Sequence, residues 1–333
     1  MSTKKSILVI TGGIEEAEIS KISSQFILQN LSKSLYQIFY AELDKNNNLY
    51  LLSDKHQEKN NSNIITFEKN GFNFQNKFQY IDYCIPCIHG HPGETGSIQP
   101  ILEFFDIKYL GNNSEVSNIC FNKVTTKMWS ELLNIPTTPY IHVYKNASIE
   151  AQAKLALSKI GRQSFVKAAK QGSSVGCYPA NDEKELIAAI KNSQQYGHHV
   201  LVEKCLKARE IEVSVFEYKN KLHITNPGEV CTNGEFYSFD EKYSPNSHTH
   251  TTLDPEKLST KTIDQIKEYC KLLFLGIGMK DLCRMDFFLL EDDTIYLNEI
   301  NTFPGMTSIS LFPKLMEKSG INFADYLNDR INN

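Results

Sequence analysis

The sequence predicts an α/β protein whose N-terminal part holds a parallel sheet. Two stretches of the chain show the same order of an apolar run, a glycine-containing loop and a helix-like segment. The first is a strand at 6–10, the loop Thr11-Gly12-Gly13 and a helix over about 16–35; the second is a strand at 83–88, a loop at 89–96 and a helix over about 97–105. Strands that alternate with helices pair in parallel, and both loops then lie at the carboxyl ends of strands, where ligands usually bind.

The size and charge of the chain narrow the class of protein. The 333 residues predict two or three domains, and 41% hydrophobic residues are enough for a core. A net charge of −4 does not favour nucleic acid as a partner. No apolar run approaches the ~18 residues of a membrane helix. We therefore expect a soluble cytoplasmic protein that binds neither nucleic acid nor membrane.

The cysteines give little sign of chemistry. Eight are scattered mostly among apolar neighbours, as buried thiols are. Cys84-Ile85-Pro86-Cys87 has C-x-x-C spacing, but it lies in a strand-like run without a second pair, so a metal or redox role is not favoured.

The next elements lie between the two N-terminal strand–loop–helix units and in the middle third of the chain. Residues 44–80 are rich in Asn and Lys and are interpreted as a peripheral insertion. The first domain is expected to end near Gly111, and a helix over 118–133 to start the next one. Strands are expected at 140–143 and 164–167, and helices at 149–160 and 183–193. The loop between the second strand and the second helix contains Gly172-Ser173-Ser174-Val175-Gly176.

The last third contains the strongest local pattern. Strands are expected at 200–204 and 210–218, a long polar stretch over 231–252, and helices at about 255–275 and 312–319. Between these helices, two apolar runs flank Asp292-Asp293, which is a hairpin signal. A two-residue turn pairs 290 with 295, 288 with 297, 286 with 299 and 284 with 301 on one face.

This pairing places two carboxylates opposite one another. Asp286 faces Glu299, with Asn301 beside them, and like charges directly opposite on a sheet repel. A bound cation explains the arrangement, and three oxygen ligands favour Mg²⁺ or Mn²⁺ over zinc. An exposed acidic face on an ordinary hairpin is the alternative.

Two further segments suit a nucleotide. The 172–176 loop offers unhindered backbone N–H groups and two hydroxyls for phosphates, with Lys123 and Lys167 as candidate charges, although a plain turn is an equal alternative. It lacks the Lys-Ser/Thr ending of a P-loop. The segment Glu203-Lys204-Cys205-Leu206 offers backbone groups to an adenine edge, or is an edge strand with solvated charges.

These motifs together, in this order, resemble the ATP-grasp superfamily and within it the D-alanine–D-alanine ligases. The resemblance spans residues 6 to about 325. It implies a three-domain ATP-grasp architecture, with an N-terminal parallel-sheet (Rossmann-like) domain and two α+β domains that clamp ATP. The implied domains are 1–112, 113–202 and 203–333. The matching segments include Gly12-Gly13, His89-Gly90, Lys242-Tyr243, Arg284-Met285-Asp286 and the run from Glu299 to Ser308.

The resemblance also implies roles for individual residues. Asp286, Glu299 and Asn301 would hold two Mg²⁺ (or Mn²⁺) ions between the phosphates of ATP. Glu18 would bind the amine of the first D-alanine and form a hydrogen-bonded triad with Ser173 and Tyr243. Arg284 and the Gly305 N–H would stabilise an oxyanion, with Ser310 and Met306 around the second D-alanine. The residues expected to contact ATP are Lys123, Lys167, Glu203, Lys204, Leu206, Glu210 and Lys242.

The implied reaction joins two D-alanines through an acyl phosphate, releases ADP and phosphate, and supplies peptidoglycan synthesis. The resemblance also implies a homodimer. Lys242-Tyr243 favours an amine acceptor over a hydroxy acid, with D-serine as an alternative to D-alanine. Another ATP-grasp carboxylate–amine ligase, or a non-catalytic nucleotide-binding relative, remain alternatives. Three positions depart from the family pattern: Thr95, Ala168 and Phe303. None removes a charge from the implied metal or ATP site.

The sequence context of the histidines separates those expected at the surface from one expected at the functional site. His198-His199 and His248 with His250 lack a carboxylate pattern and are interpreted as surface residues. His89 ends a strand in a glycine-rich loop and is expected to orient that loop or the substrate carboxylate.

Overall fold

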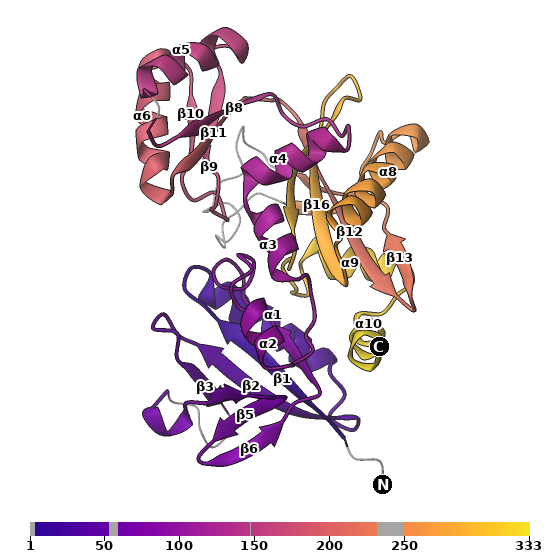
Figure 1. Cartoon of the computed structure of the whole chain (residues 1–333). Coiled ribbons are helices and arrows are strands. Elements are labelled where there is room, and N and C mark those ends of the chain that lie inside the picture. The colour runs from indigo at the N-terminus through magenta and orange to yellow at the C-terminus, as the bar shows by residue number, and fades with distance from the viewer. Residues whose placement is uncertain (1–3, 53–58, 147, 232–249) are drawn as a thin grey trace.

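The computed structural model describes residues 4–52, 59–146, 148–231 and 250–333, and it has three lobes (Figure 1). The N-terminal lobe lies at the bottom of the view, a lobe with α5 and α6 at the upper left, and the C-terminal sheet on the right. In the part of the chain that the structure describes, no helix has the length and apolar character needed to cross a membrane.

The N-terminal lobe contains the predicted parallel sheet. Its strand order is β3-β2-β1-β7, formed by β1 (Lys5–Gly12), β2 (Tyr36–Leu43), β3 (Leu49–Leu52) and β7 (Tyr83–Pro86). β1 pairs in parallel with both β2 and β7, while β3 is antiparallel to β2. The helices are α1 (Ala17–Asn30) and α2 (Gln99–Phe104). The two predicted glycine loops therefore lie at adjacent strand ends of the sheet.

Two expectations for this lobe were wrong. The first helix ends at Asn30 rather than 35, because Leu31 has an extended backbone and residues 32–35 form a turn, in which the Leu35 N–H donates to the Ser32 carbonyl, before β2 begins. Residues 44–80 are not merely a peripheral insertion. They supply β3 of the main sheet, a short 3-10 turn (Asn61–Asn63) and a meander of β4 (Thr66–Glu68), β5 (Gly71–Phe74) and β6 (Lys77–Tyr80). Phe72 of β5 is fully buried in the same core as Leu8 and Ile10 of β1.

The segment predicted as one helix over 118–133 is two helices. These are α3 (Ser114–Phe121) and α4 (Lys123–Leu132). Asn122 has an extended backbone between them, with φ −85° and ψ 104°, and its side chain accepts a hydrogen bond from the Val124 N–H. An asparagine that caps a new helix in this way stops the previous one. The break directs Lys123, the first residue of α4, toward the site described below.

The upper-left lobe is a four-stranded antiparallel sheet covered on one face by helices. Its strand order is β10-β9-β11-β8, from β8 (Tyr140–Tyr144), β9 (Ser164–Ala168), β10 (Cys177–Ala180) and β11 (His199–Lys204). α5 (Ile149–Lys159) and α6 (Glu183–Ser193) pack on the face that carries Val143, Val166 and Val200. A 3-10 turn (Gln194–Tyr196) follows α6. The opposite face carries Lys167 and Glu203 and is partly covered by α4, whose Val124 packs against Leu201 of β11.

The C-terminal lobe is built on a second antiparallel sheet with the strand order β15-β14-β12-β16-β17, and β13 also pairs with β12. The strands are β12 (Arg209–Tyr218), β13 (Lys221–Ile224), β14 (Gly228–Cys231), β15 (His250–Thr252), β16 (Leu282–Leu289) and β17 (Ile295–Asn301). Its helices are α8 (Thr260–Ile277), α9 (Leu311–Lys318) and α10 (Phe323–Asn332). α8 begins at Thr260 rather than 255, because Ser259 caps it by accepting from the Thr262 N–H.

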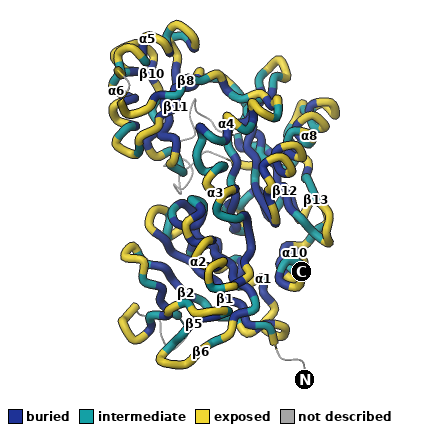
Figure 2. Tube along the Cα trace, in the orientation of Figure 1, coloured by how far each residue is buried: buried dark blue, intermediate teal, exposed yellow. Residues whose placement is uncertain are grey.

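One hydrophobic core spans the N-terminal and C-terminal lobes, and each of these lobes also contains a separate buried cluster. Ile7 and Val9 of β1 lie in the same buried cluster as Phe216 of β12, Phe312 of α9 and Phe323 of α10. The dark-blue buried residues of Figure 2 mark this core and a separate one under α5 and α6. The lobe with α5 and α6 therefore packs as a unit of its own.

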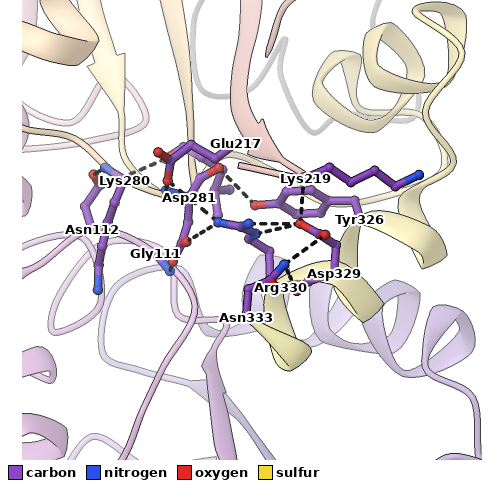
Figure 3. A network of polar contacts seen from close by, with 11 residues as sticks. Gly111, Asn112, Glu217, Lys219, Lys280, Asp281, Tyr326, Asp329, Arg330 and Asn333 are labelled. Atoms are coloured by element: carbon purple, nitrogen blue, oxygen red, sulfur yellow. Dashed lines mark hydrogen bonds and ion pairs between the residues drawn. The ribbon is translucent and has the colours of Figure 1, made fainter. Parts of the chain in front are cut away.

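A buried polar network closes the junction between the N-terminal and C-terminal lobes (Figure 3). Asp281 accepts hydrogen bonds from the Gly111 N–H (2.8 Å) and from Arg330 of α10 (3.2 Å). Asn112 donates to the carbonyl of Leu282 (2.8 Å) and accepts from the Lys280 N–H (2.9 Å). The end of the N-terminal lobe is thus tied directly to the start of β16.

Candidate active site

Three carboxylates form a row across neighbouring strands of the C-terminal sheet. Asp286 of β16 pairs with Glu299 of β17, as the sequence predicted, and with Glu212 of β12 on its other side. Directly paired residues project from the same face of a sheet. Asn301 pairs with Arg284, which brings all three predicted metal-binding side chains onto one face. Sequence reasoning singled out Glu210 but missed Glu212, although strand alternation places both on that face.

The turn and the register of the hairpin differ from the prediction, although Asp286 still pairs with Glu299. Its turn is longer by one residue: Leu289 pairs with Ile295, and Asp293 has a left-handed φ of 64°. A β-bulge between Asp286 and Phe287 then adds one residue to β17. The predicted pairs 290 with 295 and 288 with 297 are therefore wrong, whereas 286 with 299 and 284 with 301 are confirmed. The extra residue is Asn298, whose Oδ1 accepts a hydrogen bond from Lys167 Nζ (3.1 Å).

Arg284 is the cation at the centre of the carboxylate row. Its guanidinium makes two hydrogen bonds to Asp286, at 2.8 and 2.7 Å, and lies 3.2 Å from Glu212 Oε2. These carboxylates raise the pKa of Arg284 well above its usual value despite burial, which acts in the opposite direction. Asn301 donates to Asp286 Oδ2 (3.0 Å) and so fixes its own amide.

The donor set fits a hard divalent cation. Asp286, Glu299 and Asn301 supply carboxylate and amide oxygens, which Mg²⁺ prefers, and Arg284 and Lys123 are cations that contact the three carboxylates. In the described part of the chain, no cluster of three or more His, Cys, Asp or Glu side chains has metal-site geometry. The site would thus depend on Asn301, on water and on the phosphates of a ligand to complete its coordination.

Lys123 links the carboxylate row to the glycine-rich loop. Its ammonium lies 3.5 Å from Glu299 Oε2 and donates to the carbonyl of Gln171 (2.8 Å). The Lys123 N–H also donates to the carbonyl of Ala169, so the start of α4 is fixed to the start of the loop. A cation in this position can meet a phosphate held by the loop and the metal-binding face together.

Glu203 lies buried between two lysines. Its carboxylate oxygens are 2.7 Å from Lys167 Nζ and 2.8 Å from Lys127 Nζ. The two ammonium groups outweigh the desolvation of the carboxylate and lower the pKa of Glu203 to about 2. Lys127 was missed by sequence reasoning, although it lies one helical turn after Lys123 on α4. The side chain of Glu203 is therefore occupied within the protein.

The 172–176 loop has the backbone of a tight turn. Ser173 and Ser174 have left-handed φ values of 48° and 62°, and the Val175 N–H donates to the carbonyl of Gly172. A Cβ atom on Gly172 would come within 3.1 Å of Glu16 Oε1. The loop therefore lies against the start of α1 in the N-terminal lobe, and Glu16 rather than Glu18 is the residue that approaches it.

His89 occupies a rigid position at the end of β7. Its N–H donates to Ser20 Oγ (3.0 Å), and its Nε2 lies 2.8 Å from Ser23 Oγ, with both serines on α1. Burial lowers the pKa of His89 to about 4, so the ring is neutral near pH 7. Ser23 Oγ also accepts from the Met306 N–H (3.3 Å). Ser23 thus holds both His89 and the loop after β17.

The same loop carries Gly305 and Ser310. Ser310 Oγ lies 2.8 Å from Thr307 Oγ1 and accepts from the Thr307 N–H (3.1 Å), which closes a short turn before α9. A Cβ on Gly305 would approach Ser310 Oγ to 3.3 Å, so the two predicted residues are adjacent in space.

The remaining predicted residues are less closely gathered. Glu18 is exposed and pairs with Lys21 (2.9 Å), and no described contact joins it to Ser173. Lys204 is exposed at the end of β11, and its N–H donates to the carbonyl of Pro139, while Leu206 is half-buried before β12. Glu210 pairs with Phe288 of β16. Lys242 and Tyr243 lie outside the described residues.

The two antiparallel sheets, joined by the hydrogen bond from Lys167 to Asn298, with Lys123 of α4 beside the carboxylate row, define the ATP-grasp fold expected from the sequence. The comparisons then identify the family. Residues 5–112 match the model for the D-ala D-ala ligase N-terminus, and residues 128–332 match the model for its C-terminus. The chain belongs to the D-alanine–D-alanine ligase family.

Individual relatives match over the full length. A D-alanine–D-alanine ligase from Aliivibrio fischeri is 42% identical over 330 residues, which cover 98% of each chain. The solved D-alanyl-alanine synthetase A from Vibrio cholerae superposes with a TM-score of 0.91 at 40% identity, covering 100% of this chain and 98% of that one. The D-alanine–D-alanine ligase from Coxiella burnetii gives a TM-score of 0.86 at 29% identity, covering 99% and 94%.

Proposed function

We propose that this protein joins two D-alanine molecules to D-alanyl-D-alanine, with ATP converted to ADP and phosphate, for peptidoglycan precursor synthesis. The observation that carries the proposal is the row of Glu212, Asp286 and Glu299 around Arg284, flanked by Lys123, in a chain similar over its whole length to D-alanine–D-alanine ligases. Such a set of charges suits a phosphoryl transfer between two anions.

The first step would activate a carboxylate. The carboxylate of the first D-alanine is a poor acylating agent, so transfer of the γ-phosphoryl group of ATP to it would form an acyl phosphate. Lys123 and Lys167 would contact the phosphates and reduce the repulsion between the two anions. The half-buried 172–176 loop, held near Glu16, would exclude the water that hydrolyses an acyl phosphate.

Asp286, Glu299 and Asn301 would hold two Mg²⁺ or Mn²⁺ ions. Bound there, the ions would neutralise charge on the phosphates. The pairing of Asp286 with Glu299, and the Asn301 amide fixed on Asp286, support this assignment.

The second step would be attack of an amine on the acyl carbon. The oxyanion that develops would be met by Arg284 and the Gly305 N–H, and losing one such donor costs about 2.7–4 kcal/mol of transition-state stabilisation. Glu18 is proposed to bind the first amine, with Ser173 and Tyr243 nearby, and Ser310 to lie beside the second substrate. The backbone of Lys204 and Leu206, with Glu210 and Lys242, is proposed for the nucleotide. The Glu203 carboxylate would contribute to ATP binding indirectly, by holding the Lys167 ammonium in position for the phosphates.

A direct assay tests the proposal. The purified protein is incubated with Mg-ATP and D-alanine, phosphate release is measured, and the product is identified by mass spectrometry. L-Alanine, D-serine and D-lactate serve as parallel acceptors. Phosphate release matched by D-alanyl-D-alanine is the expected result. ATP binding without D-alanine-dependent turnover would overturn the proposal and favour a non-catalytic role or another acceptor.

We also propose that the protein is a homodimer, as the family resemblance implies. Light scattering coupled to size exclusion, run over a tenfold concentration range, distinguishes a dimer from the 38.0 kDa monomer. A constant monomer mass would contradict it.

A further inference from the structure

Two histidines that are 57 residues apart in the sequence lie side by side on the sheet of β8, β9, β10 and β11. His142 Nε2 of β8 lies 2.9 Å from His199 Nδ1 of β11, and the ring centroids are 5.0 Å apart. His142 pairs with Leu201, and His199 pairs with Tyr144, so the two histidines are diagonal neighbours on one face. The sequence presents His198-His199 as a surface pair, and only the fold brings His142 to His199.

The pair lies where a ligand from solution can reach it. β8 is an edge strand of its sheet, and the contact between the two rings is exposed. The opposite face of the same strands carries Val143 and Val200, which are buried beneath α5 and α6. Among the described residues, the two rings form a hydrogen bond to each other and to no other side chain. The ring of Tyr144, also on β8, lies 6.2 Å from that of His142.

We propose that His142 and His199 form a binding site for a divalent transition-metal ion, separate from the carboxylate row. Metal–imidazole bonds are about 2.0–2.1 Å long, so two cis ligands of a square-planar ion lie about 2.9 Å apart, and two ligands of a tetrahedral ion about 3.4 Å apart. The observed separation matches the square-planar case. The ion lies to one side of the line between the two nitrogens and displaces the proton that they share, after both rings rotate so that their lone pairs converge on it, and water completes its coordination.

The chemistry of the pair selects the class of ion. Imidazole nitrogens favour Cu²⁺, Ni²⁺ and Zn²⁺, and tetragonal geometry favours the first two, whereas Mg²⁺ prefers oxygen. Burial and the neighbouring His199 both lower the pKa of His142, which favours the neutral form of the ring, the form that binds metal. The site therefore differs from the carboxylate row in its donor atoms as well as in its place.

The test is a Ni²⁺ titration of the full chain by calorimetry, in buffer that contains millimolar MgCl₂ to compete at the carboxylate row. The variants are His142→Asn and His199→Asn. The matched control is His198→Asn, because His198 is the exposed neighbour of His199 and is not part of the pair. Ni²⁺ is used first because, unlike Cu²⁺, it does not oxidise thiols, and Cys205 is exposed. The test needs no enzyme assay and is independent of the proposed function.

We expect the wild-type protein to bind one Ni²⁺ in a saturable step that weakens about a hundredfold or more in either pair variant, since the second ligand acts at high effective concentration. The control variant should bind like the wild type. The same ion should raise the melting temperature of the wild type and of His198→Asn but not of the pair variants. The proposal is overturned if the pair variants retain this step, if the wild type lacks it, or if His198→Asn loses it equally.

Discussion

At the scale of single residues, Glu299 is the carboxylate on which the proposed metal site most depends. It faces Asp286 across the hairpin and contacts Lys123. Glu299→Gln keeps the shape of the side chain and removes its charge, so we expect turnover with Mg-ATP and D-alanine to fall by at least about a thousandfold, because electrostatic stabilisation is the largest part of such catalysis. Initial rates of phosphate release check this, with the exposed Glu291→Gln as the matched control. A near-normal rate for Glu299→Gln would refute the metal assignment.

Glu203 is expected to act mainly on stability and on the position of Lys167. Glu203→Gln leaves two buried lysines without their carboxylate, and breaking such a pair costs about 3–5 kcal/mol. Because the folded state lowers the pKa of Glu203 from 4.5 to about 2, its contribution is fully present above pH 4.5 and is lost as the pH falls toward 2. Urea unfolding at pH 7 and pH 3 measures both effects. Glu291→Gln, again the control, should change the free energy of unfolding little, since its partner Lys207 is also exposed. A change under about 1 kcal/mol for Glu203→Gln would contradict the prediction.

At the scale of the secondary-structure element, the β16–β17 hairpin differs from its prediction in the length of its turn and in its bulge. The hairpin was predicted with a two-residue turn, and the pairing of Asp286 with Glu299 was nevertheless correct, because the extra turn residue and the bulge at Asn298 offset one another. Polar residues at hairpin turns indicate a turn but do not fix its length, and a bulge has no signature in the alternation of a single strand. Asn298 therefore could not have been predicted, whereas Glu212 could have been, from its spacing to Glu210.

Other elements were missed for different reasons. β10 contains Pro179, which disfavours a strand except at an edge, and β10 is the edge strand beside β9. The helix predicted over 118–133 was divided by Asn122, whose capping role depends on a backbone conformation that no pattern reports. The division of the chain after residues 112 and 202 stays a prediction, and β11 continues to Lys204, past the second boundary.

The bulge residue itself carries a prediction. Asn298→Ala removes the amide oxygen that accepts from Lys167 Nζ, while the core of the hairpin keeps its partners. A hydrogen bond to a charged group contributes about 1.5–3 kcal/mol, so we expect the KM for ATP to rise about tenfold or more and the melting temperature to fall by a few degrees. Steady-state kinetics with varied ATP measure it, beside the exposed Asn192→Ala on α6 as control. An unchanged KM would show that Asn298 does not hold Lys167 for the nucleotide.

The loop between β7 and α2 carries a pH-dependent prediction. Burial, followed by the nearby Glu16, raises the pKa of Glu94 from 4.5 to about 8, while burial lowers that of His89 from 6.5 to about 4. Between pH 4.5 and 6.5 the folded protein binds one more proton at Glu94 than the unfolded chain does, and one fewer at His89. The two residues therefore have opposite effects on how the free energy of unfolding changes with pH. Between pH 6.5 and 8 only Glu94 remains, and stability should fall as the pH rises, by up to about 1.4 kcal/mol per pH unit.

Glu94→Gln isolates this effect. The variant should flatten the slope of unfolding free energy between pH 6.5 and 8 relative to the wild type, as measured by urea unfolding at several pH values. Glu115→Gln, an exposed residue in the first turn of α3, should keep the wild-type slope. Equal slopes for Glu94→Gln and the wild type would mean that Glu94 is already ionised in this range.

At the scale of the whole molecule, the distribution of cores predicts which parts unfold together. The sequence identifies apolar faces but not which faces meet, so the core shared by β1, β12, α9 and α10 could not be predicted from it. The polar network of Asp281 and Arg330 closes the same junction (Figure 3). The sheet of β8, β9, β10 and β11 instead packs under α5 and α6 with a core of its own. The first and last thirds of the chain should thus behave as one cooperative unit and the middle as another.

Hydrogen exchange in two cavity variants tests this division. Leu186→Ala removes a fully buried side chain from the core under α5 and α6, and Phe312→Ala removes one from the shared core, at about 2–5 kcal/mol each. Leu186→Ala should speed amide exchange in β8, β9 and β11 while β1 and β12 stay protected. Phe312→Ala should speed exchange in β1 and β12 together, although they lie about two hundred residues apart in the chain. If Leu186→Ala exposed β1 and β12 equally, the molecule would be a single cooperative unit, and if Phe312→Ala affected β12 without β1, the shared core would not couple the two lobes.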